Sequence, residues 1–266
     1  MPIIITGTTF TGGSSVLAPT NGSLLMGTTN AAARSRFLSV PASTAWDQTG
    51  SFTAEWWFRH TTVDNSNWIY FIFSQYQLGG YAVIIDPVSG TTWRPNVLNQ
   101  GNNYELPFSG TLYNLNTWYH MAITSNGTNG VLYVNGAIFG TWVDSNTKSN
   151  GSGGSGYPGT LYIGSMNGSY LAGSTSGVQG NISNFRWTKG VIVYTGVFTP
   201  PTRPLTVTQD AGTNISAITA GQTQLLLNTT YDNNFLTDSS TNNFTVTNND
   251  IDTPFVGVTS SALSPF

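Results

Sequence analysis

The sequence predicts an all-β protein, a sandwich or jelly roll of two antiparallel sheets, and three observations carry this prediction. Short segments alternate apolar and polar residues along most of the chain, which is the period of a half-buried strand. Turn residues recur roughly every ten residues between these segments, as they do in β-sandwiches. Aromatic residues, which strands favour, make up 13% of the 266 residues.

The first clear strand is "SFTAEWWFRH" (51–60), which alternates strictly. Its apolar face consists of Phe52, Ala54, Trp56 and Phe58. Its second face consists of Thr53, Glu55, Trp57 and Arg59. Further strands are expected at 68–76, 81–86, 118–124, 131–134, 160–165 and 182–187.

The segment 116–140 predicts a β-ribbon that ends in a tight turn. In its first strand alternate residues face opposite sides, with Tyr119, Met121 and Ile123 on one side and Trp118, His120 and Ala122 on the other. The second strand ends at Asn135-Gly136, a dipeptide suited to a two-residue turn with positive φ at both positions. We expect the ribbon to supply strands to the sandwich and no catalytic residue.

Three regions are expected along the chain. Residues 1–21 hold a short β-prone run outside the sandwich pattern, so they form either an assembly arm or an edge strand. Residues 22–205 form the main sandwich, which ends at the Pro-rich segment "TPPTRPL" (199–205). Residues 206–266 form a C-terminal β segment that either completes the sandwich or pairs with a neighbouring chain.

Composition argues against several classes of partner. Charged residues are 7% of the chain, against about 25% in an average domain, and the formal net charge is −3. The eight Lys and Arg residues form no basic stripe, so nucleic-acid binding is not expected. No apolar run reaches about 18 residues and the first residues lack a secretory pattern, so neither a membrane span nor a signal peptide is expected. Cysteine is absent, which excludes disulfides and thiolate chemistry.

Six phrases occur in an order that resembles the concanavalin A-like, laminin-G-like jelly roll. They are "FLSVP" (37–41), "FTAEWWF" (52–58), "NTWYHMAIT" (116–124), "LYVNG" (132–136), "LYIGS" (161–165) and the block 180–205. The end of that block, "YTGVFTPPTRPL", is similar to a phrase of this fold in virion structural proteins of tailed phages, especially phages of cyanobacteria. The segment 225–247 and the closing "SPF" (264–266) also resemble those proteins.

The chain departs from that pattern in two respects. The "LLL…DSS" ribbon usually precedes the "FLSVP" strand, whereas here it lies at 225–247 and only "GSLLM" (22–26) comes first. Members that bind calcium use a loop carboxylate, and the loop acids here are Asp47, Asp64 and Asp144. None has a second acid within three residues, and calcium needs six to eight oxygen ligands. We therefore expect no cofactor, with calcium as the less favoured alternative.

The acid pattern argues against an enzyme. A glycosidase needs two carboxylates about 5–5.5 Å or 6.5–9.5 Å apart, which on one strand calls for acids two or four residues apart on the same face. Glu55 is the sole acid on its strand. Asp250 and Asp252 have suitable spacing but lie in an unpatterned tail. His120 could share a sheet face with Glu55, but no nucleophile elbow is present. Because Glu55 receives no catalytic role, Glu55→Gln is expected to leave folding and activity largely intact.

Aromatic residues beside loop polar groups suggest a glycan site, because sugars stack on indole and phenol rings. The candidate glycan-binding residues are Asp64, Asn67, Trp68, Trp93, Arg94 and Tyr157. The alternative for Trp68 and Trp93 is a packing role in the core or at its rim. Four tryptophans in strong strand patterns are expected to pack in the interior: Trp56, Trp57, Trp118 and Trp187.

These observations together predict a non-enzymatic structural protein on the surface of a tailed-phage virion, either a capsid decoration or a short tail appendage. Its expected partners are other virion proteins, further copies of itself and a host surface glycan, with neither nucleic acid nor membrane. It would be made in the host cytoplasm. The alternative is a free-standing, lectin-like carbohydrate-binding module of a cellular organism.

Overall fold

The computed structural model describes residues 21–27, 36–46, 48–61, 70–74, 81–89, 92–99, 114–143, 159–165, 177–228, 235–250 and 258–266. Within these ranges the chain forms strands and one short 3-10 helix, η1 (Thr44–Trp46). The strands are β1 (Ser23–Gly27), β2 (Arg36–Val40), β3 (Phe52–His60), β4 (Tyr70–Ser74), β5 (Tyr81–Ser89), β6 (Thr92–Asn99), β7 (Trp118–Ser125), β8 (Asn129–Val134), β9 (Ala137–Val143), β10 (Leu161–Ile163), β11 (Gly180–Lys189), β12 (Thr223–Leu227), β13 (Thr247–Asp250) and β14 (Thr259–Ser261).

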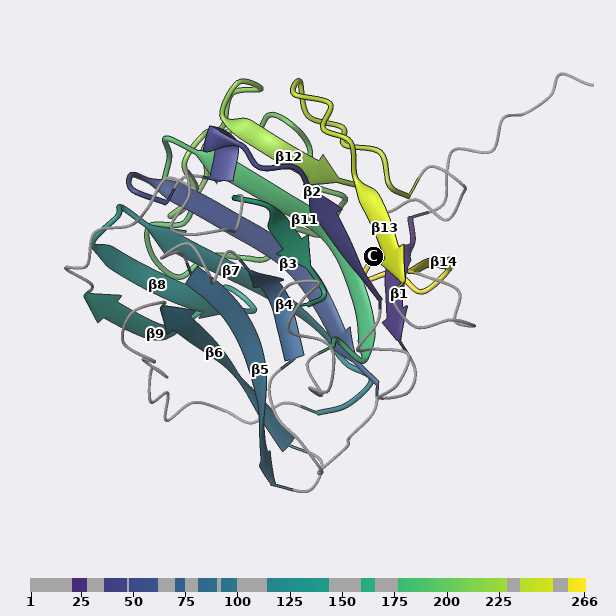
Figure 1. Cartoon of the computed structure of the whole chain (residues 1–266). Coiled ribbons are helices and arrows are strands. Elements are labelled where there is room, and N and C mark those ends of the chain that lie inside the picture. The colour runs from purple at the N-terminus through teal and green to yellow at the C-terminus, as the bar shows by residue number, and fades with distance from the viewer. Residues whose placement is uncertain are drawn as a thin grey trace, which may run out of the picture.

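The strands form two antiparallel sheets, which Figure 1 shows as two layers. The eight-stranded sheet has the order β14-β1-β11-β3-β7-β8-β9, and β12 pairs with β11 beside this path. The six-stranded sheet has the order β13-β2-β10-β4-β5-β6. This arrangement confirms the prediction of an all-β sandwich of two antiparallel sheets.

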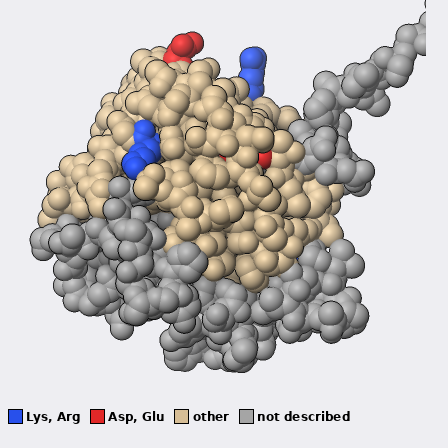
Figure 2. Space-filling model, turned by 45° about the horizontal axis from the view of Figure 1, so that its top comes forward, with Lys and Arg blue, Asp and Glu red and all other residues tan. Residues whose placement is uncertain are grey.

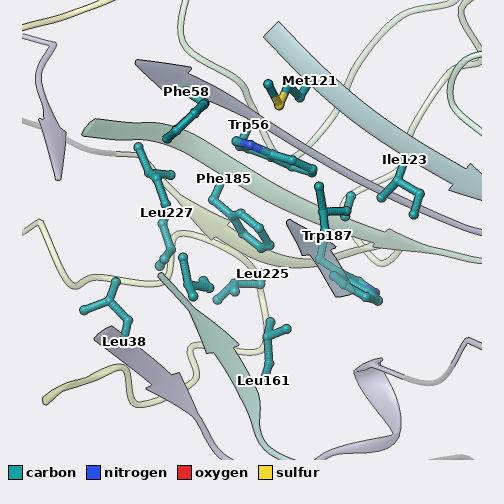
Figure 3. Packing of buried hydrophobic residues seen from close by; sticks show 14 of the residues in the cluster. Leu38, Trp56, Phe58, Met121, Ile123, Leu161, Phe185, Trp187, Leu225 and Leu227 are labelled. Carbon is teal, nitrogen blue, oxygen red and sulfur yellow. The ribbon is translucent and has the colours of Figure 1, made fainter. Parts of the chain in front are cut away.

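The main core lies between the two sheets, and Figure 3 shows part of it. Trp56 and Phe58 of β3 point into it and are exposed by 0% and 2%, so the predicted apolar face of β3 is confirmed. Leu38 and Leu161 of the six-stranded sheet pack from the opposite side. Truncating a buried aromatic side chain to Ala costs about 3–5 kcal/mol, so this face contributes strongly to stability.

The ribbon expected at 116–140 is formed by β7, β8 and β9. Asn135 and Gly136 join β8 to β9 with φ values of 48° and 79°, the left-handed values that the dipeptide predicts. The Asn135 N–H donates to the His120 carbonyl at 2.7 Å, and Asn135 Oδ1 accepts from the His120 N–H at 2.9 Å. A Cβ atom at Gly136 would collide with the Phe198 carbonyl, so glycine is required there.

A β-bulge in β11 sorts its side chains between the two faces of the sheet. The register against β3 shifts between Ser183 and Arg186, where Asn184 takes a positive φ of 52°. The extra residue allows Phe185 to point into the core and Arg186 to lie on the outer face, opposite Glu55. In a regular strand these two positions would be exchanged.

Strands that follow residue 205 join both sheets. β1 pairs with β11 from Gly180 to Ile182, and β12 pairs with the continuation of β11 from Phe185 to Thr188, so β1 and β12 line the same edge of β11. β13 pairs with β2, and β14 pairs with β1. In this structure the C-terminal segment therefore completes the sandwich within the chain.

Asp238 shapes the loop that follows β12. Its carboxylate accepts backbone N–H groups of Leu226, Ser240 and Phe244 at 2.9–3.0 Å. It is buried, and a carboxylate that accepts several N–H groups can replace missing backbone partners. The "DSS" phrase of the sequence thus has a structural role.

Two differences from the predicted elements concern β6 and the N-terminal region. The sequence pattern does not predict β6, because Pro95 interrupts it. Proline is tolerated at the edge of a sheet, and β6 is an edge strand of the six-stranded sheet. Residues 1–20, nearly all of the predicted arm, lie outside the described residues.

Candidate functional site

The outer face of the eight-stranded sheet, opposite the main core, carries the polar and aromatic residues of three neighbouring strands. The register of β11, β3 and β7 arranges them in rows. The rows are Asn181–Arg59–Trp118, Ser183–Trp57–His120 and Arg186–Glu55–Ala122. The pairing of His120 with Trp57 confirms that His120 shares a sheet face with Glu55.

One half of this face is a buried ionic cluster centred on Glu55. Arg186 donates to Glu55 Oε1 from Nε at 2.8 Å and from Nη2 at 2.5 Å. Tyr194 donates its hydroxyl to Glu55 Oε2 at 2.5 Å, and His120 Nε2 lies 3.2 Å from the same oxygen. All four side chains are buried.

The segment 190–222 covers this cluster. Arg186 donates from Nη1 to the Thr206 carbonyl at 2.8 Å and from Nη2 to Gln209 Oε1 at 2.7 Å. Apolar contacts continue the cover, and the residues that form this second small core are Ala122, Tyr133, Val193, Tyr194, Phe198 and Ile218. Tyr194 and Phe198 stack with ring centroids 3.7 Å apart. The cluster is therefore closed to substrates.

Electrostatics fix the protonation of the cluster. Burial by itself would raise the pKa of Glu55, but the Arg186 charge and hydrogen bonds from His120 and Tyr194 lower it to about 2. Burial and the Glu55 charge raise the pKa of Tyr194 well above its ordinary value. At neutral pH Glu55 is ionised and Tyr194 protonated. A glycosidase acid needs a raised pKa, which Glu55 lacks.

This geometry corrects the expectation that Glu55→Gln leaves folding intact. Removing the negative charge would leave the Arg186 guanidinium buried without its counter-ion, a change that costs several kcal/mol in other proteins. The sequence assigns Glu55 no catalytic role, and in the structure it acts as a structural anchor.

The other half of the outer face is partly open to solvent, and we call it the Arg59 patch: Trp57, Arg59, Asn116 and Trp118, with the buried Asn181 beside them. Arg59 donates from Nη2 to Asn116 Oδ1 at 2.8 Å, from Nε to the Asn116 carbonyl at 3.3 Å and from Nη1 to Asn181 Oδ1 at 3.4 Å. Trp118 of β7 lies opposite Arg59 and Trp57 lies two residues before it on the same face of β3, and both are partly exposed.

The patch presents groups suited to a hydroxyl-rich ligand. A guanidinium has five N–H donors, of which Arg59 uses three within the described residues. Indole faces offer apolar stacking surface beside these donors. Phe266 contacts Trp57 edge to face with centroids 5.8 Å apart, so the last residue of the chain borders the patch.

The structure places two of the predicted glycan residues, and both lie on the other sheet. Trp93 of β6 is 2% exposed and packs against His60 edge to face, with centroids 4.4 Å apart. This position favours the packing alternative for Trp93. Arg94, next to it on β6, is partly exposed. The remaining candidates, Asp64, Asn67, Trp68 and Tyr157, lie outside the described residues.

The sequence pattern predicted an interior position for Trp57 and Trp118, the two tryptophans of the Arg59 patch. Trp56 and Trp187 are fully buried as expected, whereas Trp57 and Trp118 lie on the outer face and are partly exposed. The alternation of β3 already placed Trp57 on the face of Glu55 and Arg59. A search for aromatic residues that share a face with a cation would have found it.

The described residues contain neither a metal-binding cluster nor a membrane-spanning helix. No group of three or more His, Asp or Glu side chains among the described residues could hold a metal ion. Asp47, Asp64 and Asp144, considered for calcium, lie outside that part of the chain. No helix within the described ranges is long and apolar enough to cross a membrane.

Comparison with known proteins establishes the family. Residues 32–193, more than half of the chain, match the concanavalin A-like lectin/glucanases superfamily, and the protein belongs to this superfamily. The resemblance inferred from the ordered phrases is thereby confirmed. A search of the curated proteins finds no match.

Solved structures match this chain at low sequence identity. A putative carbohydrate-binding protein from Bacteroides ovatus is 15% identical with a TM-score of 0.56, over 92% of this chain and 61% of that one. A heptameric SAP-like pentraxin from Limulus polyphemus is 17% identical with a TM-score of 0.45, over 63% of this chain and 75% of that one. This chain thus spans less than two thirds of the length of the Bacteroides protein.

Proposed function

We propose that the protein is a non-enzymatic, lectin-like sandwich that binds a glycan through the Arg59 patch. The observation that carries this proposal is the placement of Arg59, held by Asn116 and Asn181, on the same sheet face as two partly exposed tryptophans. Amide, guanidinium and indole groups together can hydrogen-bond sugar hydroxyls and stack on the apolar face of a pyranose. The fold similarity to a putative carbohydrate-binding protein supports the same class.

The absence of catalysis is part of the proposal, since the superfamily also contains glucanases. Three acids have described side chains. Glu55 is buried and ionised, Asp238 is buried among backbone N–H groups, and Asp210 is exposed on the segment that covers the sheet. None of them forms the pair of carboxylates that hydrolysis of a glycosidic bond requires.

Binding to a glycan array, followed by titration of the best ligand, tests the proposal. Arg59→Ala should weaken binding on the order of tenfold or more, because charge-assisted hydrogen bonds are lost. Arg94→Ala is the matched control, as it makes the same change at the other predicted site. Wild-type protein should release no reducing sugar from any glycan that it binds.

The possible results separate the two sites. Loss of binding in Arg94→Ala, with Arg59→Ala unaffected, would move the site to the predicted loop residues and refute the Arg59 patch. Failure of the wild-type protein to bind any glycan would refute the lectin-like function. Release of reducing sugar would refute the non-enzymatic assignment.

We further propose that this lectin-like protein is a surface component of a tailed-phage virion, where it contacts other virion proteins and attaches to a host glycan. The supporting observation is the ordered series of phrases that ends in "YTGVFTPPTRPL" and continues at 225–247. Its low charge also suits a subunit that packs closely with neighbours, and Figure 2 shows few charged side chains on the described part of one face. Synthesis in the host cytoplasm follows from this proposal.

Mass spectrometry and immunogold labelling of purified particles test the virion role. A constant copy number per particle, with label on the capsid or the tail, is expected. A protein that separates completely from particles while retaining glycan binding would instead be a free-standing lectin-like module.

A further inference from the structure

The edge strand β9 differs from an ordinary protected edge. It lies at one end of the eight-stranded sheet, and Figure 1 shows it at the left margin beside β8. It is seven residues long and contains neither a charged residue nor a proline. Ile138 and Val143 on this strand are 50% and 78% exposed.

The other edges of the sandwich carry features that block further pairing. β14, at the opposite end of the same sheet, has three residues. In the six-stranded sheet, β6 contains Arg94 and Pro95, and β13 is four residues long and ends at Asp250. Short length, charge and proline are the usual means by which proteins prevent edge-to-edge association. β12 also has a side without a strand partner, but Asp238 occupies it: its carboxylate accepts the Leu226 N–H and its backbone bridges to Leu227. Among the remaining edges of the described sheets, β9 lacks all three.

The geometry of β9 leaves a regular stretch for pairing. Its register with β8 shifts between Leu132 and Tyr133, near Ile138, and such a bulge disturbs pairing locally. Beyond the bulge, Gly140 to Val143 pair with β8 without interruption. Thr141 and Val143, whose β8 partners Val131 and Asn129 alternate with the core-facing Leu132, lie on the outer face.

We propose that β9 pairs antiparallel with β9 of a second copy of this chain, so that the two eight-stranded sheets become one continuous sheet. An antiparallel pair of identical strands is related by a two-fold axis, so each strand meets the same surface that it presents. Because β9 is uncharged, a second copy brings no like charges together across the axis. Pairing would also cover Val143, the most exposed large apolar side chain of the described residues.

Sedimentation equilibrium of the full chain with a matched pair of variants tests this interface. Wild-type protein should have the mass of two chains. Val143→Lys places one lysine from each copy in the shared strand pair, where the like charges repel, and should raise the dimer dissociation constant on the order of tenfold or more. Val197→Lys makes the same change at a residue that is 61% exposed on the covering segment, and it should remain dimeric.

Thr141→Lys gives a second variant on the same strand, since Thr141 is exposed. Thermal unfolding of each variant is compared with that of the wild-type protein in the same oligomeric state. An unchanged melting temperature would show that the fold is intact. A wild-type protein that stays monomeric at all concentrations would overturn the proposal, including the case in which β9 serves a different partner. A dimer that survives both lysine substitutions on β9 would overturn it as well.

Discussion

The two halves of the outer face of the eight-stranded sheet use similar residues for different purposes. Arg186 and Arg59 lie on adjacent strands and on the same face of the sheet. Arg186 is fully buried and bound to a carboxylate, whereas Arg59 is partly exposed and bound to neutral amides. The segment 190–222, which covers the first half of the face, makes the difference. Whether a charged side chain serves stability or recognition here depends on what lies above it.

The largest expected effect is that of Glu55→Gln in the covered half. The substitution keeps the shape of the side chain but leaves the buried Arg186 charge without a counter-ion. The free energy of unfolding should fall by about 3–5 kcal/mol, the usual cost of breaking a buried ion pair. Urea unfolding monitored by tryptophan fluorescence measures this. A loss below about 1 kcal/mol would mean that the cluster is open to water.

Acid should lower the free energy of unfolding over a defined pH range, because Glu55 in the covered half becomes protonated. Glu55 has a pKa of about 2 in the folded protein and 4.5 ordinarily, so between these values the unfolded chain binds more protons and acid favours unfolding. The full stabilisation is present above pH 4.5 and is lost as the pH falls towards 2. A shift of this size corresponds to about 3 kcal/mol.

His60 adds a loss of stability at higher pH, as the pH falls from 6.5 to about 4. Burial lowers the pKa of His60 to about 4 in the folded protein, so in this range His60 is protonated in the unfolded chain but not in the folded one. Urea unfolding at a series of pH values measures both steps. The upper step should disappear in His60→Gln, which is the control. A wild-type profile that is flat below pH 4.5 would contradict an ionised, paired Glu55.

A smaller loss is expected for Tyr194→Phe. The change removes the hydroxyl that donates to Glu55 Oε2 at 2.5 Å and keeps the ring that stacks on Phe198. A hydrogen bond to a charged group contributes about 1.5–3 kcal/mol, and the free energy of unfolding should fall by that amount. Tyr133→Phe is the control, because the Tyr133 hydroxyl donates to a neutral carbonyl and its loss should cost less. An equal cost for both variants would show that the charge of Glu55 adds nothing.

A still smaller effect on stability is expected for Trp118→Ala in the open half. Its indole is partly exposed at the start of β7, outside the main core, so the free energy of unfolding should fall by about 1 kcal/mol or less. Glycan binding should be lost, since a stacking surface is removed. A large loss of stability would return Trp118 to the packing role that the sequence predicted for it.

Much of the fold could be predicted because its strands alternate locally. The faces of β3 and the Asn135-Gly136 turn depend on neighbouring residues alone, and both were predicted correctly. The bulge at Asn184 breaks the alternation of β11, and its local hint is that Ile182, Phe185 and Trp187 are apolar at unequal spacing. Pairing of β13 and β14 with strands near the start of the chain is set by the tertiary fold, which local patterns do not report.

The candidate site was less predictable for a physical reason. The sequence shows that Glu55, Trp57 and Arg59 share one face of β3, but it does not show which of them becomes covered. The cover is the segment 190–222, which lacks regular strands and therefore has no periodic signal. This is why a structural role for Glu55 and a surface position for Trp57 both escaped prediction.

A matched pair of substitutions, Arg186→Met and Arg59→Met, tests the central claim most directly. Both remove a guanidinium from the same face of the same sheet and keep an unbranched apolar side chain. Arg186→Met should lower the free energy of unfolding by about 3–5 kcal/mol, because it leaves Glu55 buried and unpaired, and its folded form should still bind glycan. Arg59→Met should change stability by about 0.5 kcal/mol or less and abolish glycan binding. Similar losses of stability in the two variants, or loss of glycan binding in folded Arg186→Met with binding retained in Arg59→Met, would contradict the division of this face into a structural half and a binding half.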